Sequence, residues 1–280
     1  MQRIESVEEM RAAADVCRRR NQRIALVPTM GALHAGHASL IKLAREKADV
    51  VVTSIFVNPL QFGPSEDSAR FPRDLPNDLA VCEQAGVTVV FTPTAPAMFP
   101  RGYSTHVIED AVSKPLEGLT RPSLFRGMLT GTIKLLNIVR PDVLVLGEEE
   151  PQQVAVVRKA MADLSIPVEV VAGPTIREAD GLACSARNRF LSPGQRAEAL
   201  AAWQALGKVR EMVAQGVRSA DRLIAEATHI LTQKRRVRVI YISVVDRTNF
   251  EPMREITPGQ SLMVMAVWVD EVRLIDSLPI

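Results

Sequence analysis

Two histidines in the segment PTMGALHAGHASL, residues 28–40, have the side-chain type and the spacing that phosphate chemistry needs. His34 and His37 lie three residues apart, between an apolar run and a helical pattern, so we expect them at the start of a helix. Backbone N–H groups and the positive end of a helix favour anions such as phosphate, and two imidazoles can donate to a phosphate or stabilise a leaving pyrophosphate. Gly31 and Gly36 would let the backbone approach such a ligand closely.

Two other interpretations of this histidine pair stay open. The rings could cap the helix and do nothing more. The His-x-x-His spacing could instead hold a metal ion, but no Cys, Asp or Glu nearby completes a set of ligands. We therefore favour the anion-binding role and assign no metal ligand.

Neutral amide side chains follow two other apolar runs. Asn58 and Gln61 lie in a long segment, 56–79, and Gln153 lies in the segment GEEEPQQ at 147–153. Amides suit the hydroxyls and the carboxylate of a small acid, so these residues are candidate substrate ligands. A long surface loop of turn residues is the alternative for 56–79, although connections of this length tend to be functional or disordered.

A polar linker, READGLACSARNRFLS at 177–192, carries several arginines. Arg177, Arg187 and Arg189 accompany Ser185 and Asn188 in this stretch. Arginine in a mobile linker above a nucleotide site can close on phosphate through charge-assisted hydrogen bonds. An ordinary solvated hinge is the alternative.

The elements that must position these residues alternate between strands and helices. Apolar β-branched runs at 23–27, 50–57, 87–91, 143–147 and 167–171 predict strands, and helical patterns are found at 6–20, around 40–44, and at 78–84, 129–139 and 152–164. This alternation predicts a Rossmann-like α/β fold with a parallel sheet. Ligands of such sheets bind beyond the carboxyl ends of the strands, where the polar segments fall.

The pattern changes after about residue 175. Helices are expected at 195–215 and 220–232, and strands at 237–245, 261–269 and 272–276. We therefore predict two domains: 1–175, a Rossmann-like domain that binds the ligands, and 176–280, a smaller α+β domain joined through the polar linker.

Composition narrows the class of protein. The 280 residues are 47% apolar and 24% charged, which is typical of globular chains. The net charge of +2 is too balanced for a protein that coats nucleic acid, and no run of 18 apolar residues predicts a membrane span. The N-terminal residues do not have the pattern of a signal peptide. Cys17, Cys82 and Cys184 are far apart, as expected in a reducing cytoplasm.

Over nearly all of its length, the chain resembles the pantothenate synthetases, also called pantoate–β-alanine ligases. The strings PTMGALHAGH, SIFVNPLQFGP, IVRP, READGLA and ARNRFLS carry this resemblance. It implies a nucleotidyltransferase-type Rossmann domain, a C-terminal domain that closes over the site, and a homodimer. The family uses ATP and Mg²⁺ to adenylate pantoate, releasing pyrophosphate, and the amine of β-alanine then attacks the acyl adenylate.

The resemblance also implies roles for individual residues. His37 matches the proton donor of the family, and His34 and Arg187 join it as catalytic candidates. Gln61 and Gln153 match the pantoate ligands, beside our own candidate Asn58. The expected ATP-binding residues are Met30, Gly31, His34, Gly36, His37, Gly147, Glu149, Glu150, Ile176, Cys184, Ser185 and Arg187.

The chain departs from the family pattern in four places. Where the family reads G-[EK]-K-D-[FY]-Q-Q, this chain reads GEEEPQQ, so Glu149 replaces a phosphate-binding lysine. At an effective dielectric near 20, a charge pair at 4 Å is worth about 4 kcal/mol, so the reversed sign could cost several kcal/mol beside a triphosphate. The family's M-S-S-R is CSAR at 184–187, while Leu124 and Phe71 replace a common His and a common Tyr.

Three functions are consistent with this sequence. The first is an ordinary pantothenate synthetase whose missing positive charge comes from another residue, such as Lys114, Arg121, Arg126 or Lys134. The second is a divergent adenylate-forming ligase that acts on another acid or amine. The third is a weakly active paralogue that binds a pantoate-like acid as a regulatory protein.

Overall fold

The computed structural model describes residues 1–63 and 71–280, and these residues form two compact units. The first unit contains 1–148 and 156–174, and the second contains 149–155 and 175–280. The boundary expected from sequence, after residue 175, assigned the short segment 149–155 to the first part. The two units are described separately below, and the roles of ligand-binding domain and lid stay predictions.

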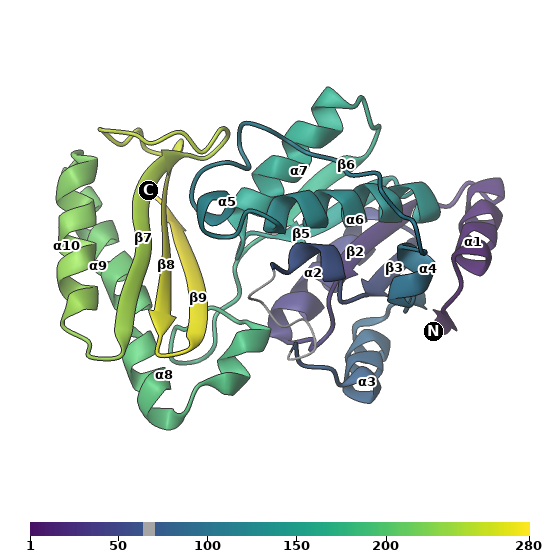
Figure 1. The fold of residues 1–280 in the computed structure, drawn as a ribbon, viewed down its shortest axis with the longest axis horizontal. Helices are drawn as coiled ribbons and strands as arrows, with labels where there is room; N and C mark the ends of the chain where they lie inside the picture. The colour runs from purple at the N-terminus through teal and green to yellow at the C-terminus, as the bar shows by residue number, and fades with distance from the viewer. Residues whose placement is uncertain (64–70) are drawn as a thin grey trace. The chain divides into compact units, whose positions relative to one another are not determined.

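A parallel sheet of six strands forms the centre of the first unit among the described residues (Figure 1). The strand order is β1-β4-β3-β2-β5-β6. The chain runs from β2 to β3 and β4 on one side, then returns to β5 and β6 on the other. This reversal places a topological switch point between β2 and β5. The strands are β1 (Gln2–Ile4), β2 (Ile24–Thr29), β3 (Val50–Ile55), β4 (Val89–Phe91), β5 (Val143–Gly147) and β6 (Glu169–Gly173).

The strands β2, β3, β4 and β5 are mostly buried on both faces, as their sequences predict, whereas the edge strand β6 is only partly buried. In β2, Ala25 and Val27 pack in a cluster with Leu40 and Ile41 of the first long helix after the strand. Leu26 points to the opposite face and is also fully buried. The switch point is therefore framed by strands that cannot shift without opening the core.

Helices of the first unit begin at polar caps. Ser6 accepts a hydrogen bond from the Glu9 N–H and starts α1, as the sequence predicts. The Rossmann-like α/β prediction is confirmed, while the short elements β1, α4 and α5 were missed because three or four residues show no periodicity. The helices are α1 (Val7–Arg19), α2 (Ala35–Lys47), α3 (Leu75–Ala85), α4 (Ala95–Met98), α5 (Glu117–Thr120), α6 (Leu124–Val139) and α7 (Pro151–Asp163).

The long connection expected at 56–79 is shorter than predicted. A 3₁₀ turn, η1 (Pro59–Gln61), begins three residues after Phe56, and α3 already begins at Leu75. Residues 64–70 of that expected loop, including the last proline of the family-like string, lie outside the described residues.

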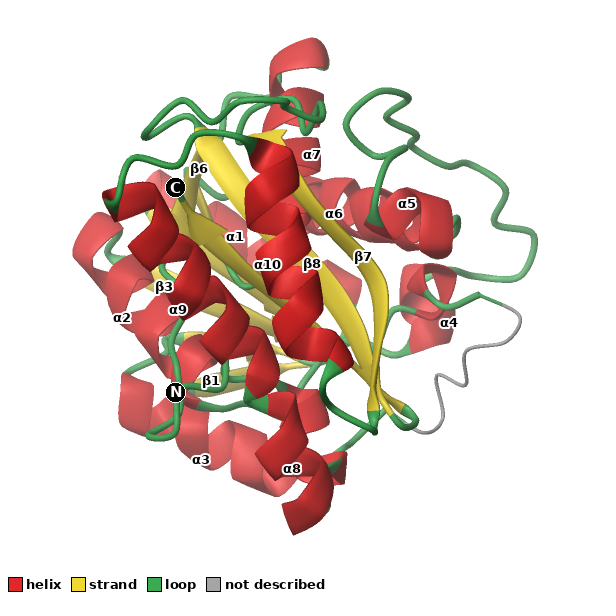
Figure 2. Ribbon diagram, turned by 90° about the vertical axis from the view of Figure 1, so that its left-hand side faces the viewer, coloured by secondary structure: helices red, strands yellow, loops and turns green. Residues whose placement is uncertain are grey.

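The second unit combines helices with an antiparallel sheet, which has three strands in the described part of the chain. Figure 2 shows α9 and α10 side by side along one face of β7, β8 and β9. Their apolar residues form one cluster with the sheet, including Leu206, Leu223 and Met265. The elements are η3 (Ala186–Phe190), α8 (Pro193–Ala199), α9 (Ala201–Ala214), α10 (Ala220–Thr232), β7 (Val237–Asp246), β8 (Ser261–Val269) and β9 (Val272–Pro279).

The single helix expected at 195–215 is two helices. A capping box between Ser192 and Gln195 starts α8, and the chain then breaks at Leu200 before α9. Neither proline nor glycine marks this break, and buried alanines continue on both sides of it, so the apolar pattern gave no sign of it. None of the helices in the described ranges combines the length and hydropathy of a bilayer-spanning helix.

Candidate functional site

The turn between β2 and α2 carries the two histidines and is tightly bent. Gly31 has φ +89° and Ala32 has φ +54°, so two successive residues adopt the left-handed conformation. Alanine rarely adopts it, because its Cβ crowds the backbone. His34 is the N-cap of α2 and His37 is at position N3, so both histidines lie at the start of the helix, as predicted.

The backbone N–H groups of this turn are already bonded to side chains. The Gly31 N–H donates to Thr29 Oγ1 at 3.2 Å, and the Ala32 and Leu33 N–H groups donate to Asp78 at 2.9 and 2.7 Å. Those of His34 and Gly36 donate to imidazole nitrogens at 3.3 and 3.2 Å. The sequence led us to expect backbone N–H groups here to face an anion. That expectation is wrong for these five groups.

The two imidazoles face one another and share a tautomer. Their ring centroids are 4.1 Å apart, and the Nδ1 atom of each ring accepts a backbone N–H. A neutral ring whose Nδ1 accepts carries its proton on Nε2. Burial, together with the neighbouring His34, lowers the pKa of His37 from 6.5 to about 3. His37 is therefore an uncharged ring with an Nε2–H donor at neutral pH.

The segment that carries Asn58 and Gln61 lies directly on helix α6. A Cβ added at Gly127 would lie 2.0 Å from the carbonyl oxygen of Leu60, and one at Gly131 would lie 2.5 Å from Asn58 Nδ2. These two glycines therefore permit the close approach. Asn58 is buried: its Oδ1 caps η1 by accepting the Leu60 N–H, and its Nδ2 donates to the Gly127 carbonyl.

Asn58 and Gln61 differ in whether the side-chain amide is already engaged by the protein. The contacts of Asn58 make it a structural amide that fixes the turn. Gln61 ends η1 and is half-buried. In the second unit, the Gln153 N–H donates to the Glu150 carbonyl at 3.0 Å in the first turn of α7, and the side chain of Gln153 is half-buried.

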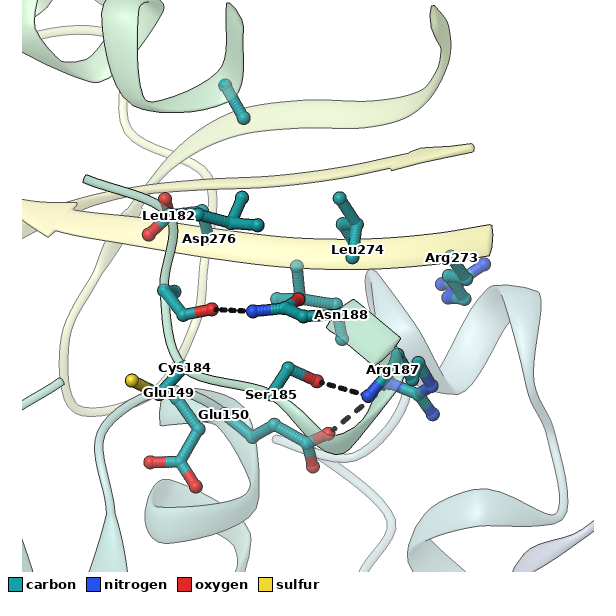
Figure 3. Close-up of a pocket in the computed structure, with 13 residues that line it drawn as sticks. Glu149, Glu150, Leu182, Cys184, Ser185, Arg187, Asn188, Arg273, Leu274 and Asp276 are labelled. Carbon is teal, nitrogen blue, oxygen red and sulfur yellow. Dashed lines mark hydrogen bonds and ion pairs between the residues drawn. The ribbon is translucent and has the colours of Figure 1, made fainter. Parts of the chain in front are cut away.

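A pocket of about 480 Å³, partly open to solvent, lies within the second unit (Figure 3). It brings together five of the residues predicted to bind the nucleotide: Glu149, Glu150, Cys184, Ser185 and Arg187. Ser185 Oγ accepts the N–H of Arg187 at 3.2 Å, and Arg187 Nη1 lies 4.0 Å from Glu150 Oε1. The arginine is thus paired with one of the glutamates that made the sequence look unsuited to ATP.

Glu149 is less charged at neutral pH than an ordinary glutamate. Burial raises the pKa of its carboxyl from 4.5 to about 7, against a hydrogen bond from its own backbone N–H, and the neighbouring Glu150 raises this pKa further. Protonation therefore removes much of the negative charge that the replacement of lysine by Glu149 introduces.

The polar linker is anchored within the second unit. The Cys184 N–H donates to the Ile176 carbonyl at 2.9 Å, so the linker folds back on itself. Arg177 donates to both carboxylate oxygens of Asp276 at 2.8 Å, and its guanidinium lies 3.8 Å from the ring centroid of Trp203. A bidentate, stacked arginine is held in one orientation. The expectation of a mobile linker or an ordinary solvated hinge therefore does not fit this segment.

Three charged residues near these sites were missed by sequence reasoning. Asp78 lies in an otherwise ordinary helical pattern and gave no signal. Arg273 and Asp276 line the pocket from β9, and charged residues within an apolar strand pattern could have indicated them. The other predicted residues lie in the first unit: Met30 and Gly36 beside the histidines, and Gly147 at the end of β5.

No group of three or more His, Cys, Asp or Glu side chains that could hold a metal ion is found within 1–63 and 71–280.

The fold and the histidine turn define a class of protein: an α/β enzyme of the Rossmann type, with paired imidazoles after the central strand at the switch point. The family model for pantoate-beta-alanine ligase matches residues 2–279, and the chain belongs to this family of amide-forming ligases.

Individual relatives agree over their full lengths. A pantothenate synthetase from Heliobacterium modesticaldum is 46% identical over 278 residues, covering 99% of both chains. The crystal structure of pantothenate synthetase from Thermus thermophilus superposes with a TM-score of 0.94 at 39% identity, covering 100% of this chain and 99% of that one.

A further solved structure is a pantoate-beta-alanine ligase from Francisella tularensis, complexed with beta-gamma ATP and beta-alanine. It superposes with a TM-score of 0.79 at 30% identity and covers 100% of this chain and 97% of that one. These relatives support the first of the three functions considered from the sequence, and not the two alternatives.

The close packing of η1 on α6 predicts the effect of a single methyl group. We expect Gly127→Ala to push Leu60 and Gln61 away from the helix and to lower the free energy of unfolding by about 1–3 kcal/mol, measured by urea denaturation. Gly207→Ala in α9 is the matched control, because nothing lies within 4 Å of the added Cβ. It should leave stability unchanged or raise it by up to about 1 kcal/mol. Equal effects of the two substitutions would contradict the packing described here.

The Glu149 carboxyl should titrate near pH 7, measured from its ¹³C chemical shift. Glu150→Gln removes a negative neighbour, so it should lower this pKa. Because the folded-state pKa lies above the ordinary value of 4.5, the contribution of Glu149 to stability is fully present below about pH 4.5 and is lost as pH rises through about 7. Glu149→Gln should flatten that part of the stability profile. A midpoint at the ordinary value would refute the burial of this carboxyl.

Proposed function

We propose that this protein condenses pantoate with β-alanine to form pantothenate, in two steps driven by ATP. The observation that carries the proposal is the family match over residues 2–279, together with a pair of imidazoles held at the end of the central strand. The Francisella tularensis relative, complexed with beta-gamma ATP and beta-alanine, supports the choice of substrates.

In the first step, a carboxylate oxygen of pantoate attacks the α-phosphorus of ATP. A new P–O bond forms, the bond to the leaving pyrophosphate breaks, and pantoyl adenylate results. Negative charge grows on the leaving oxygen, and preorganised donors aimed at that charge accelerate such a reaction. We assign this role to the Nε2–H groups of His34 and His37, with Arg187 contributing positive charge.

This assignment refines the proton donor that the family resemblance implied. A ring with a pKa of about 3 is almost never an imidazolium at neutral pH, so His37 acts by hydrogen bonding from its neutral form.

In the second step, the amine of β-alanine attacks the acyl carbonyl of the adenylate. The C–N bond forms, the bond to AMP breaks, and the proton of the amine passes to the departing AMP phosphate or to solvent. Gln61 and Gln153 offer amides for the hydroxyls and the carboxylate of pantoate. Asn58, whose amide is already engaged with Leu60 and Gly127, holds η1 and thereby Gln61 in place.

Mg²⁺ enters this scheme as part of the substrate, bound to the ATP phosphates. Magnesium commonly keeps several waters and is held by one or two carboxylates plus substrate phosphates. The remaining ATP ligands of this proposal are Met30, Gly147, Glu149, Glu150, Ile176, Cys184 and Ser185. Gly31 and Gly36, whose N–H groups are already bonded, shape the turn instead.

We also propose that the protein is a homodimer that works in the cytoplasm. The dimer follows from the family resemblance, and the compartment follows from the three cysteines, none of which is paired in a disulfide.

Pantoate-dependent exchange of labelled pyrophosphate into ATP tests the first step. We expect exchange by the unaltered protein, and a decrease of at least about 100-fold in His37→Ala, because the donor to the leaving group is lost. His229→Ala, on α10, is the control and should retain full activity. Absence of pantoate-dependent exchange, with turnover of another acid, would overturn the proposed function. A normal rate in His37→Ala would reduce His37 to a helix cap.

The position of Glu149 at the phosphates can be tested by charge reversal. Glu149→Lys restores the sign that the family pattern has, so we expect the Kd for ATP to fall at least about fivefold, measured by calorimetry at pH 8. Glu149→Gln should give part of this gain at pH 8 and little at pH 6, where the native carboxyl is mostly protonated. Glu46→Lys on α2 makes the same change in net charge at an exposed position. Unchanged ATP affinity in Glu149→Lys would contradict this position.

A further inference from the structure

Asp78 connects helix α3 to the histidine turn. Its side chain is almost completely buried, with 1% exposed. Oδ2 accepts the N–H of Ala32 at 2.9 Å, and Oδ1 accepts the N–H of Leu33 at 2.7 Å. Neither the sequence patterns nor the proposed mechanism gives this carboxylate a role, although it binds the two residues that come directly before His34.

The turn depends on outside support for its conformation. Ala32 is in the left-handed region next to Gly31, which is also left-handed, and such residues persist only where their surroundings hold them. Gly31 donates to Thr29 Oγ1, and the next two N–H groups both go to Asp78. The carboxylate thus binds the strained residue and the one that follows it.

An ionised carboxylate is the side chain suited to this position. It presents two acceptor oxygens, one for each N–H, and charge strengthens both bonds. An asparagine would present one acceptor and one NH₂ group, which would meet an N–H donor. The space is also fixed, since a Cβ on residue 31 would lie 2.8 Å from Oδ2.

Hydrogen bonds of successive backbone N–H groups link Asp78 to the two imidazole rings. The Asp78 carboxylate accepts the Leu33 N–H. The next N–H along the chain, that of His34, donates to His37 Nδ1 at 3.3 Å. The Gly36 N–H in turn donates to His34 Nδ1 at 3.2 Å. Rotation of the peptide between Leu33 and His34 would withdraw the donor that keeps the proton of His37 on Nε2.

We propose that Asp78 is a positioning residue that sets the orientation and the Nε2–H tautomer of His34 and His37. It touches neither substrate, and it acts only through the backbone of Ala32 and Leu33. The effect on catalysis rests on the proposed function, whereas the effect on the rings does not.

The test compares Asp78→Asn with Asp142→Asn. Asp142 is a matched control because its Oδ2 also accepts a backbone N–H, that of Ile24 at 2.8 Å, in the same unit but at the start of β2. Imidazole nitrogens are observed by long-range ¹H–¹⁵N NMR of the ligand-free protein. The chain contains four histidines, so single substitutions assign the signals.

The native protein and Asp142→Asn should show His37 with Nδ1 unprotonated and Nε2 protonated. Asp78→Asn should show averaged nitrogen shifts, as expected when both tautomers are populated. A His37 pattern identical to that of the native protein would overturn the proposal, because a purely structural carboxylate would leave the tautomer unchanged.

Activity provides the second readout. Asp78→Asn should lower kcat for pyrophosphate exchange by about 10- to 100-fold, the range expected from misplaced catalytic groups, and change the KM for pantoate by less than about threefold. A loss confined to KM, or shared equally by Asp142→Asn, would count against positioning. If the native protein shows no exchange, the proposed function fails while the NMR comparison still decides the role of Asp78.

A second variant covers the case in which Asp78→Asn does not fold. Gly31→Ala keeps the carboxylate and displaces it through the added Cβ, 2.8 Å from Oδ2. It should produce the same averaged His37 signals, and unchanged signals in this folded variant would overturn the proposal.

Discussion

The turn after β2 has five backbone N–H groups that no helix or strand can satisfy, and the arrangement of the histidine site follows from how they are bonded. Thr29, Asp78, His34 and His37 supply the acceptors. Buried donors without acceptors are costly, so each of these side chains is held where an N–H group requires it. The rings are therefore ordered by the hydrogen bonds that the backbone requires.

Charge in the pocket of the second unit is balanced in a different way. Three consecutive glutamates would repel a polyphosphate if all of them were ionised. Burial brings the pKa of Glu149 to about 7, and Glu150 lies close enough to Arg187 to share its charge. A lysine at position 149 would act as a permanent cation, whereas this carboxyl changes its charge around neutral pH. The departure from the family pattern thus makes the charge of this pocket depend on pH.

Sequence reasoning succeeded where one local pattern determines the outcome. The buried strands β2 and β5 and the start of α2 were predicted because apolar runs and capping residues are read directly along the chain. The break at Leu200 was missed because neither proline nor glycine marks it, and the short strand β1 was missed because its pairing partner, β4, is far away in sequence. Asp78 is the clearest case. It lies 46 residues from the N–H of Ala32 that it binds, and nothing near it in the helix indicates that contact. The structural role of Asn58 was hidden for the same reason, because the carbonyl that it binds belongs to Gly127.

Arg177 stacks on Trp203, which places a cation beside one of the fluorescent side chains of this protein. The chain has two tryptophans, Trp203 and Trp268, and both lie in the second unit. Trp203 is in van der Waals range of a guanidinium, whereas the ring centroid of Trp268 is 5.9 Å from the guanidinium carbon of Arg273. Indole emission responds to a nearby cation and to water, and Arg177 belongs to the linker that leads to Ser185 and Arg187. Intrinsic fluorescence of the unlabelled protein should therefore change when Arg177 leaves the ring of Trp203.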